Sequence, residues 1–245
     1  MPELTVVVPL LNEEPNVLPL HEELTHSLSS AHIDYELVLV DDGSTDATFA
    51  RLRELHQRDR RVRVLRFVRN FGQTAAFAAG FAAARGNFIA TIDGDLQNDP
   101  RDLPRLLELC RTHDIVSGWR RHRQDNFLTR TVPSVAANYL LGVVSGIRLH
   151  DNGCSLKVYR AAVVKPLRLR PGMHRYLPAL ASQLGNRVAE VVVNHRPRRY
   201  GRSKYGLSRT FTVLGDLVRL RSLMARAVGT GEPAAPWFEV AETLG

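Results

Sequence analysis

Apolar runs alternate with segments of helical periodicity through the first half of the chain. The pattern predicts strands over residues 4–9, 35–40, 61–67, 87–92 and 114–118. It predicts helices over residues 15–29, after an N-cap at Asp46, over residues 74–86 and over residues 103–109. Such alternation implies crossover connections, and therefore a mostly parallel sheet with helices on both faces. The sequence thus predicts a Rossmann-like fold of the α/β class.

Acidic side chains follow three of these predicted strands. Glu13 comes after the first strand, Asp41 and Asp42 after the second, and Asp93 and Asp95 after the fourth. Ligands of parallel sheets lie beyond the carboxyl ends of the strands. Because segments far apart in the sequence place carboxylates at this same edge, the arrangement indicates a binding site more strongly than any single motif does.

The stretch IATIDGDLQNDP, residues 89–100, ends a predicted buried strand in two aspartates. A polar turn is one explanation of the pair. The other is a bound Mg²⁺ or Mn²⁺, which favours the oxygen ligands that Asp93, Asp95 and Gln97 supply and often shares them with substrate phosphates. The stretch VDDGSTDAT, residues 40–48, is explained either as turn chemistry or as a carboxylate that accepts hydrogen bonds from a nucleobase or ribose.

The 245-residue chain has a net charge of +8, which favours polyanionic partners: nucleic acid, an anionic membrane surface or phosphorylated substrates. The acids at the strand ends argue against a nucleic-acid-binding module. Cys110 and Cys154 form no C-x-x-C pair, which predicts reduced thiols in a cytosolic protein. The N-terminus shows neither the basic start nor the cleavage site of a signal peptide.

Five stretches occur together in one order and spacing: VVVPLLNEEPN, LVLVDDGSTDAT, RNFGQTAAFAAGFAAARGNFIATIDGDLQNDP, HDNGCSLKVYR and RRYGRSKYGLSRT. Together they resemble glycosyltransferase family 2, in the branch of dolichol-phosphate mannosyltransferase and the bacterial polyprenyl-phosphate sugar transferases. The resemblance covers about residues 4 to 210. It implies a GT-A fold and an inverting transferase that moves a sugar from a nucleotide-diphosphate sugar to a polyprenyl phosphate.

The resemblance also implies roles for individual positions. The positions that match nucleotide contacts are Pro9, Leu11, Glu13, Val40 and Asp42, with leucine at position 11 where many relatives carry tyrosine. The implied metal ligands are Asp93, Asp95 and Gln97. The positions that match contacts to the acceptor phosphate are Arg120, Arg130 and Ser134. Arg198 and Lys204 match residues of an R-x-x-G-x-S-K loop that close on the donor diphosphate, and we take Asp93, Asp95 and Arg198 as the catalytic residues.

The residue types agree with a phosphate acceptor. A sugar hydroxyl needs a general base, whereas a phosphomonoester, with a second pKa of about 6, is already anionic at neutral pH. Such an acceptor needs cations instead, and the stretch WRRHRQDNFLTR, residues 119–130, supplies arginines suited to bidentate contacts. The alternatives are a GT-A transferase with a sugar or protein hydroxyl as acceptor, a basic nucleic-acid-binding module and an inactive partner subunit.

Three parts are predicted along the chain: a GT-A domain over residues 1–210, an amphipathic helix over residues 211–228 and a flexible tail over residues 229–245. The helix is expected either to pack on the domain or a dimer partner, or to lie on an anionic membrane surface. No stretch is long and apolar enough to predict a membrane span. We therefore expect a cytoplasmic protein that binds peripherally to the cytoplasmic face of the membrane. A membrane-spanning protein is a possible partner, and no nucleic-acid partner is expected.

Overall fold

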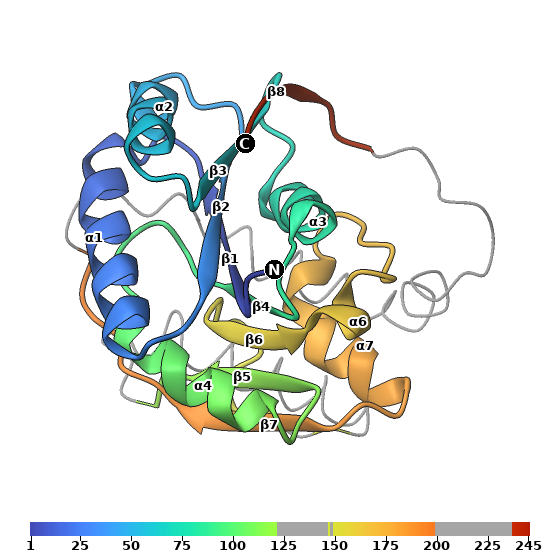
Figure 1. The fold of residues 1–245 in the computed structure, drawn as a ribbon. Helices are drawn as coiled ribbons and strands as arrows, with labels where there is room; N and C mark the ends of the chain where they lie inside the picture. Colours follow the sequence, from blue (N-terminus) through green and yellow to red (C-terminus); the bar gives the residue numbers. More distant parts are fainter. Residues whose placement is uncertain (122–146, 148, 199–236) are drawn as a thin grey trace.

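The computed structural model describes residues 1–121, 147, 149–198 and 237–245, in which strands and helices alternate (Figure 1). The strands are β1 (Leu4–Leu10), β2 (Tyr35–Asp41), β3 (Val62–Phe67), β4 (Phe88–Thr91), β5 (Ile115–Trp119), β6 (Lys157–Arg160), β7 (Val188–Val192) and β8 (Val240–Leu244). The α-helices are α1 (Glu14–Ser30), α2 (Thr48–Arg58), α3 (Gln73–Ala83), α4 (Leu103–Cys110), α6 (Ala161–Val164) and α7 (Leu177–Gln183). Short 3-10 helices are η1 (Pro100–Asp102) and η3 (Met173–Tyr176).

The strands form an eight-stranded sheet in the order β7-β5-β6-β4-β1-β2-β3-β8. The central strand β1 is parallel to β2 on one side and to β4 on the other. β2 is parallel to β3, and β5 to β7. β6 runs antiparallel to both β4 and β5, and β8 antiparallel to β3. The mostly parallel sheet predicted from the sequence is confirmed.

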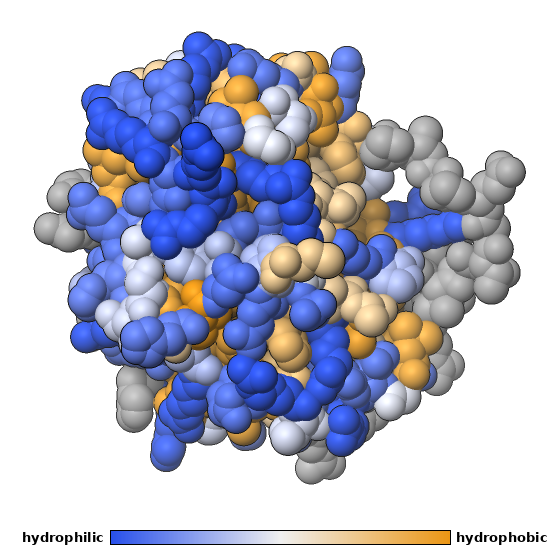
Figure 2. Space-filling view, in the orientation of Figure 1, coloured by the Kyte–Doolittle hydropathy of each residue, from blue (hydrophilic) through white to orange (hydrophobic). Residues whose placement is uncertain are grey.

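Helices cover both faces of this sheet, as predicted (Figure 1). α1, α2 and α4 contribute to one buried apolar cluster, and α3, α6 and α7 to another. Within β1, Val6 and Val8 belong to the first cluster and Val7 to the second. Burial on both faces explains why the strand is a continuous apolar run. The face seen in Figure 2 is mostly hydrophilic, with apolar residues in small separate areas.

Two helix boundaries differ by a few residues from those that the sequence predicts. The N-cap of α2 is Ala47, one residue after the predicted Asp46, whose carboxylate accepts a hydrogen bond from the Thr48 backbone N at 3.0 Å. Helix α3 ends at Ala83, before Gly86, where the sequence predicted the stop. Gly86 instead packs against β1, where an added Cβ would lie 2.7 Å from the Thr5 backbone N.

The prediction of a flexible tail over residues 229–245 is wrong for its last part. Residues Val240–Leu244 form β8, which pairs with β3 and covers that edge of the sheet. Trp237 and Phe238 precede the strand and pack against the core. The stretch VAETL has little strand propensity of its own, and the partner strand that orders it lies far away in the sequence.

The amphipathic helix predicted over residues 211–228 and the first part of the predicted tail lie outside the described residues. In the part of the chain that the structure does describe, no helix has the length and apolarity needed to cross a membrane.

Gly80 of α3 provides a test of the packing between this helix and β1. A Cβ at this position would lie 2.2 Å from Val7 Cγ1. In an unobstructed helix, alanine is more stable than glycine by about 1 kcal/mol. Here we expect Gly80→Ala to lower the free energy of unfolding by about 1–3 kcal/mol, because Val7 is fully buried and its β-branched side chain is stiff. Urea unfolding measures the difference.

The matched control is Ala82→Leu, which adds carbon atoms at an exposed position of the same helix. We expect its unfolding free energy to stay within about 0.5 kcal/mol of that of the wild type. A Gly80→Ala protein as stable as the wild type would contradict the close contact with β1.

Candidate active site

The carboxyl ends of six strands meet at one edge of the sheet. β1, β2, β3 and β4 are parallel, and β5 shares their direction because β4 and β5 are both antiparallel to β6. β7 follows β5. The register places Leu10 beside Asp41, and Val7 beside Thr91. The acids that follow β1, β2 and β4 therefore lie at a common edge, as the sequence predicts, and the first residues of β6 and β8 lie there too.

Asp93 and Asp95 come directly after β4, and each is held by a different neighbour. Gln73 Nε2, at the start of α3, donates to Asp93 Oδ1 at 2.6 Å. Arg198 Nη2 donates to Asp95 Oδ2 at 2.7 Å and to Gln97 Oε1 at 3.3 Å. The Gln97 backbone N donates to Asp95 Oδ1 at 3.2 Å. The structure thus brings the three predicted metal ligands together, with Arg198 beside them.

The electrostatics of Asp95 show what this arrangement requires. Burial, followed by the nearby Asp93 carboxylate, raises the pKa of Asp95 to about 6, and Arg198 acts in the opposite direction. Two close carboxylates disfavour each other's charged form, so a positive charge placed between them stabilises both. Among the described residues, the Arg198 guanidinium supplies that charge to Asp95.

The same oxygen atoms suit a hard divalent cation. Carboxylate and amide oxygens are ligands that Mg²⁺ and Mn²⁺ prefer, and a cation would relieve the repulsion between Asp93 and Asp95. Within the described ranges, no group of three or more His, Cys, Asp or Glu side chains is poised to hold a metal ion. Mg²⁺ often takes only one or two protein carboxylates and completes its ligands with substrate phosphates and water, and Asp93 and Asp95 fit that pattern.

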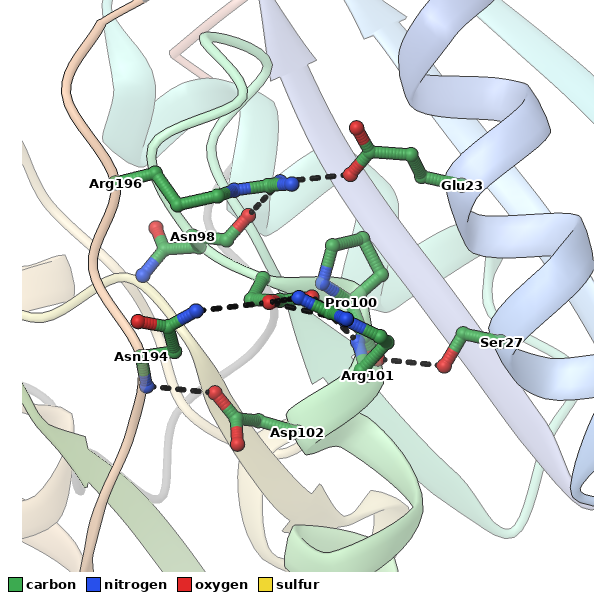
Figure 3. Close-up of polar contacts among 9 residues, drawn as sticks. Glu23, Ser27, Asn98, Pro100, Arg101, Asp102, Asn194 and Arg196 are labelled. Atoms are coloured by element: carbon green, nitrogen blue, oxygen red, sulfur yellow. Dashed lines mark hydrogen bonds and ion pairs between the residues drawn. The ribbon is translucent and has the colours of Figure 1, made fainter.

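Hydrogen bonds join the segment after β7 to the segment after β4, and this contact positions Arg198 beside the acid pair. Arg196 lies between the two segments and α1, as Figure 3 shows. Its Nη2 donates to Glu23 Oε2 at 2.7 Å and to the Asn98 carbonyl oxygen at 2.9 Å. Its backbone N donates to the Gln97 carbonyl oxygen at 2.8 Å. The chain then reaches the acid pair two residues later.

The loop after β4 is itself anchored at several points (Figure 3). Asn194 donates from its backbone N to Asp102 Oδ2 at 2.8 Å and from Nδ2 to Asp99 Oδ2 at 3.0 Å. Although burial opposes it, hydrogen bonds from Arg101 and Asn194 hold the pKa of Asp99 below its ordinary value. Ser27 Oγ of α1 donates to the carbonyl oxygen of Pro100 at 2.8 Å. These bonds fix the loop between α1 and the segment after β7.

On the other side of β1, Asp42 ties the end of β2 to the loop between β3 and α3. Its carboxylate accepts from the backbone N of Phe71 at 2.7 Å and of Gly72 at 2.9 Å. Burial raises the pKa of Asp42, and these N–H groups oppose the shift. Gly43 follows with a φ of +73°, and a Cβ there would lie 2.4 Å from the carbonyl carbon of Arg69. Glycine at this position is therefore required for the close approach of the two loops.

The other positions predicted to contact a nucleotide have different surroundings. Pro9 of β1 is partly exposed and lies level with Val40 of β2, whose side chain is fully buried. Leu11 is partly exposed just beyond β1. Glu13 is buried, and its Oε2 accepts from Asn16 Nδ2 at 2.5 Å in the first turn of α1. The nucleotide contacts of these residues stay a prediction.

Arg120, predicted to hold the acceptor phosphate, is bound by a carboxylate that the sequence analysis did not single out. Asp151 accepts from Arg120 Nε at 2.7 Å and from Nη2 at 2.9 Å. Burial alone would lower the pKa of Arg120, but Asp151 raises it above its ordinary value. Glu190 of β7 holds the turn that carries this acid, because Oε1 accepts from the Asp151 N at 2.9 Å and Oε2 from the His150 N at 3.0 Å.

A second buried cation, Lys157, begins β6 next to this ion pair. Its Nζ donates to the carbonyl oxygens of Asn152, at 3.1 Å, and Cys154. Burial lowers the pKa of Lys157, whereas the negative charge of Asp93 raises the pKa of both Lys157 and Arg120. The two cations therefore lie within electrostatic range of Asp93. The stretch HDNGCSLKVYR contained both Asp151 and Lys157, but nothing local in it identified their partners.

Arg130, Ser134 and Lys204 lie outside the described residues, as do Gly201 and Ser203 of the R-x-x-G-x-S-K loop. The structure thus places only Arg120 of the predicted acceptor-phosphate residues, and only Arg198 of the predicted diphosphate contacts.

The ion pair of Asp151 and Arg120 predicts a large cost when one partner is removed. Their side chains are only 6% and 11% exposed, so Asp151→Ala leaves a buried guanidinium without its carboxylate. We expect a loss of about 3–5 kcal/mol in the free energy of unfolding. The control is Glu108→Ala, which breaks the exposed pair with Arg111 and should cost less than about 1 kcal/mol. Chemical denaturation that gave equal losses for both variants would contradict the buried role of Asp151.

The same fold occurs in solved glycosyltransferases. Glucosyl-3-phosphoglycerate synthase from Mycobacterium tuberculosis, in complex with Mn²⁺, UDP and phosphoglyceric acid, matches with a TM-score of 0.70 at 20% identity, over 96% of this chain and 80% of that chain. At this identity the match shows the fold alone. The chain therefore has the fold of a GT-A glycosyltransferase.

Sequence comparison gives the family. The sequence model of the family Glycosyl transferase family 2 matches residues 5–168. The chain is 48% identical over 227 residues to dodecaprenyl-phosphate galacturonate synthase of Rhizobium johnstonii, covering 91% of this chain and 67% of the relative. It is 37% identical over 217 residues to undecaprenyl-phosphate 4-deoxy-4-formamido-L-arabinose transferase of Edwardsiella ictaluri, covering 88% and 66%. The chain therefore belongs to glycosyl transferase family 2, and it spans about two-thirds of the length of these curated relatives.

Proposed function

We propose that this glycosyltransferase moves a sugar from a nucleotide-diphosphate sugar to a polyprenyl phosphate. The observation that carries the proposal is the pair Asp93 and Asp95 at the carboxyl edge of β4, with Arg198 bonded to Asp95 at 2.7 Å. A site with two adjacent acids and an arginine beside them suits a metal-bound diphosphate as leaving group. The names of the matched relatives, both polyprenyl-phosphate transferases or synthases, support the acceptor class.

On the donor side, Asp93, Asp95 and Gln97 would hold Mg²⁺ or Mn²⁺. When bound, the cation neutralises charge on the diphosphate of the departing nucleotide. Asp42 and Glu13, at the ends of β2 and β1, would orient the nucleoside by accepting its N–H or O–H groups. Arg198 is already directed at this position, and in the proposed complex its guanidinium would turn from Asp95 to the diphosphate oxygens, a role that Lys204 shares.

On the acceptor side, no general base is required, because the phosphate arrives as an anion at neutral pH. Arg130 and Ser134 are proposed to bind it, together with Arg120. Nε and Nη2 of the Arg120 guanidinium each donate to Asp151, so a phosphate contact would use Nη1 or the second hydrogen of Nη2. The buried pair thus holds the guanidinium in one orientation before the acceptor binds.

A lipid acceptor places the reaction at a membrane surface. The net charge of +8 favours an anionic bilayer, to which each nearby Lys or Arg contributes about 1 kcal/mol. We propose peripheral binding to the cytoplasmic face, through the basic segment before and within residues 211–228 or through a membrane-spanning partner protein.

The test of the proposal is a panel of nucleotide-activated sugars offered with a short polyprenyl phosphate, with lipid-linked sugar measured by mass spectrometry. The panel includes activated galacturonate, 4-deoxy-4-formamido-arabinose, mannose and glucose. The matched polyprenol, which ends in a hydroxyl group, serves as the control acceptor. Transfer to the phosphate but not to the alcohol is the expected result. Transfer to the alcohol at the same rate would contradict the proposed acceptor.

The acid pair gives a second prediction for the same assay. Asp95→Asn should lower kcat by at least about a hundredfold while the protein remains folded, because it removes charge from the cation site. Asp34→Asn, an exposed acid before β2, is the control and should keep wild-type turnover. Excess EDTA should stop the wild type, and Mn²⁺ should restore it. Full turnover in EDTA, or in Asp95→Asn, would be incompatible with the metal role.

A further inference from the structure

The last described segment, residues 237–245, begins near the carboxyl ends of the parallel strands and forms the outermost strand at the opposite end of the sheet from β7. β8 pairs antiparallel with β3, from Val64↔Leu244 to Phe67↔Val240, so β8 begins where β3 ends. The Val68 N also donates to the Glu239 carbonyl oxygen at 3.2 Å. Figure 1 shows β8 beside β3, as the outermost strand of the sheet. The segment just before β8 therefore lies against the loop that joins β3 to α3.

Aromatic rings connect this segment to that loop. Phe238 stacks on Phe67, with ring centroids 5.2 Å apart and planes at 28°. Phe67 in turn meets Phe71 edge to face, at 5.7 Å and 88°. Trp237 packs edge to face on Phe238 at 6.0 Å, and its Nε1 donates to the Leu169 carbonyl oxygen at 2.9 Å. The ring contacts of Phe238, together with the hydrogen bonds of its neighbours Trp237 and Glu239, thus fix its position.

The loop that these rings support carries groups of the proposed donor site. The backbone N–H groups of Phe71 and Gly72 donate to the Asp42 carboxylate. The next residue, Gln73, donates from Nε2 to Asp93 at 2.6 Å. Gly72 has a φ of +89°, which glycine adopts without strain, so this residue does not restrict the loop to one backbone shape by itself.

We propose that Phe238 is a positioning residue for the donor site. Its ring packs on Phe67, which in turn packs on Phe71. This packing fixes the backbone N–H groups of Phe71 and Gly72, which orient Asp42, and the side-chain amide of Gln73, which orients Asp93. The inference rests on the proposed function in one respect: the substrate whose binding it affects is the nucleotide-diphosphate sugar. Phe238 acts through the loop and does not touch the substrate.

The experiment uses the full chain with Phe238→Leu, which keeps apolar volume but loses the stacked ring, and Phe238→Tyr, which keeps the ring. The control is Val240→Ala, in the same segment, whose side chain is 38% exposed and contributes no ring contact. Deuterium exchange over residues 68–73 is measured without substrate, and KM is measured for donor and acceptor separately.

Phe238→Leu should speed exchange over residues 68–73 severalfold and raise the donor KM by about two- to tenfold, with the acceptor KM unchanged. Phe238→Tyr should restore wild-type values, and Val240→Ala should not change them. Unchanged exchange in Phe238→Leu, an equal rise of both KM values, or the same effects in Val240→Ala would overturn the proposal. If the wild type transferred no sugar, the proposed function would fail, while the exchange comparison would still decide whether Phe238 orders the loop.

Discussion

Parallel backbone pairing of β1 with β2 and with β4 is the constraint on which the site depends. The pairing sets Leu10 level with Asp41, and Val7 level with Thr91, so the chain leaves each strand at the same edge. The carboxylates of Asp42 and Asp93 reach that edge from segments that are distant in sequence. Val6 and Val7 are fully buried on the two faces of β1, so helices pack on both sides of the strand that carries this pairing.

Carboxylates that lie close together at a buried site repel one another unless positive charge lies nearby. Arg198 supplies such a charge to Asp95, and the cations Arg120 and Lys157 lie within electrostatic range of Asp93. Each cation is held by contacts remote from the acids: Asp151 binds Arg120, and the contacts of Arg196 bring Arg198 into place. The site is therefore organised before substrate binds, which reduces the reorganisation needed during transfer.

Much of this could be predicted from the sequence because its signals are local. Strand and helix patterns gave the mostly parallel sheet, and the strand-end acids gave the edge at which Asp42, Asp93 and Asp95 lie. The partners of charged groups were not predictable in this way. The pairing of Arg120 with Asp151 joins residues 31 positions apart, and Arg196 bonds to Glu23 across 173 positions. Strand β8 was missed for the same reason, because its order comes from β3 and from the rings of Trp237 and Phe238.

If the acid pair binds a nucleoside diphosphate through a divalent cation, the nucleotide and the cation must each strengthen the binding of the other. Titration of Mn²⁺ in the presence and absence of UDP or GDP, with free Mn²⁺ followed by electron paramagnetic resonance, measures this coupling. Coupling is reciprocal, so the nucleotide should tighten Mn²⁺ binding in the wild type as much as Mn²⁺ tightens nucleotide binding. Asp93→Asn should abolish this coupling. Equal Mn²⁺ affinity with and without nucleotide, or coupling that survives in Asp93→Asn, would contradict binding of the nucleotide by the acid pair through the cation.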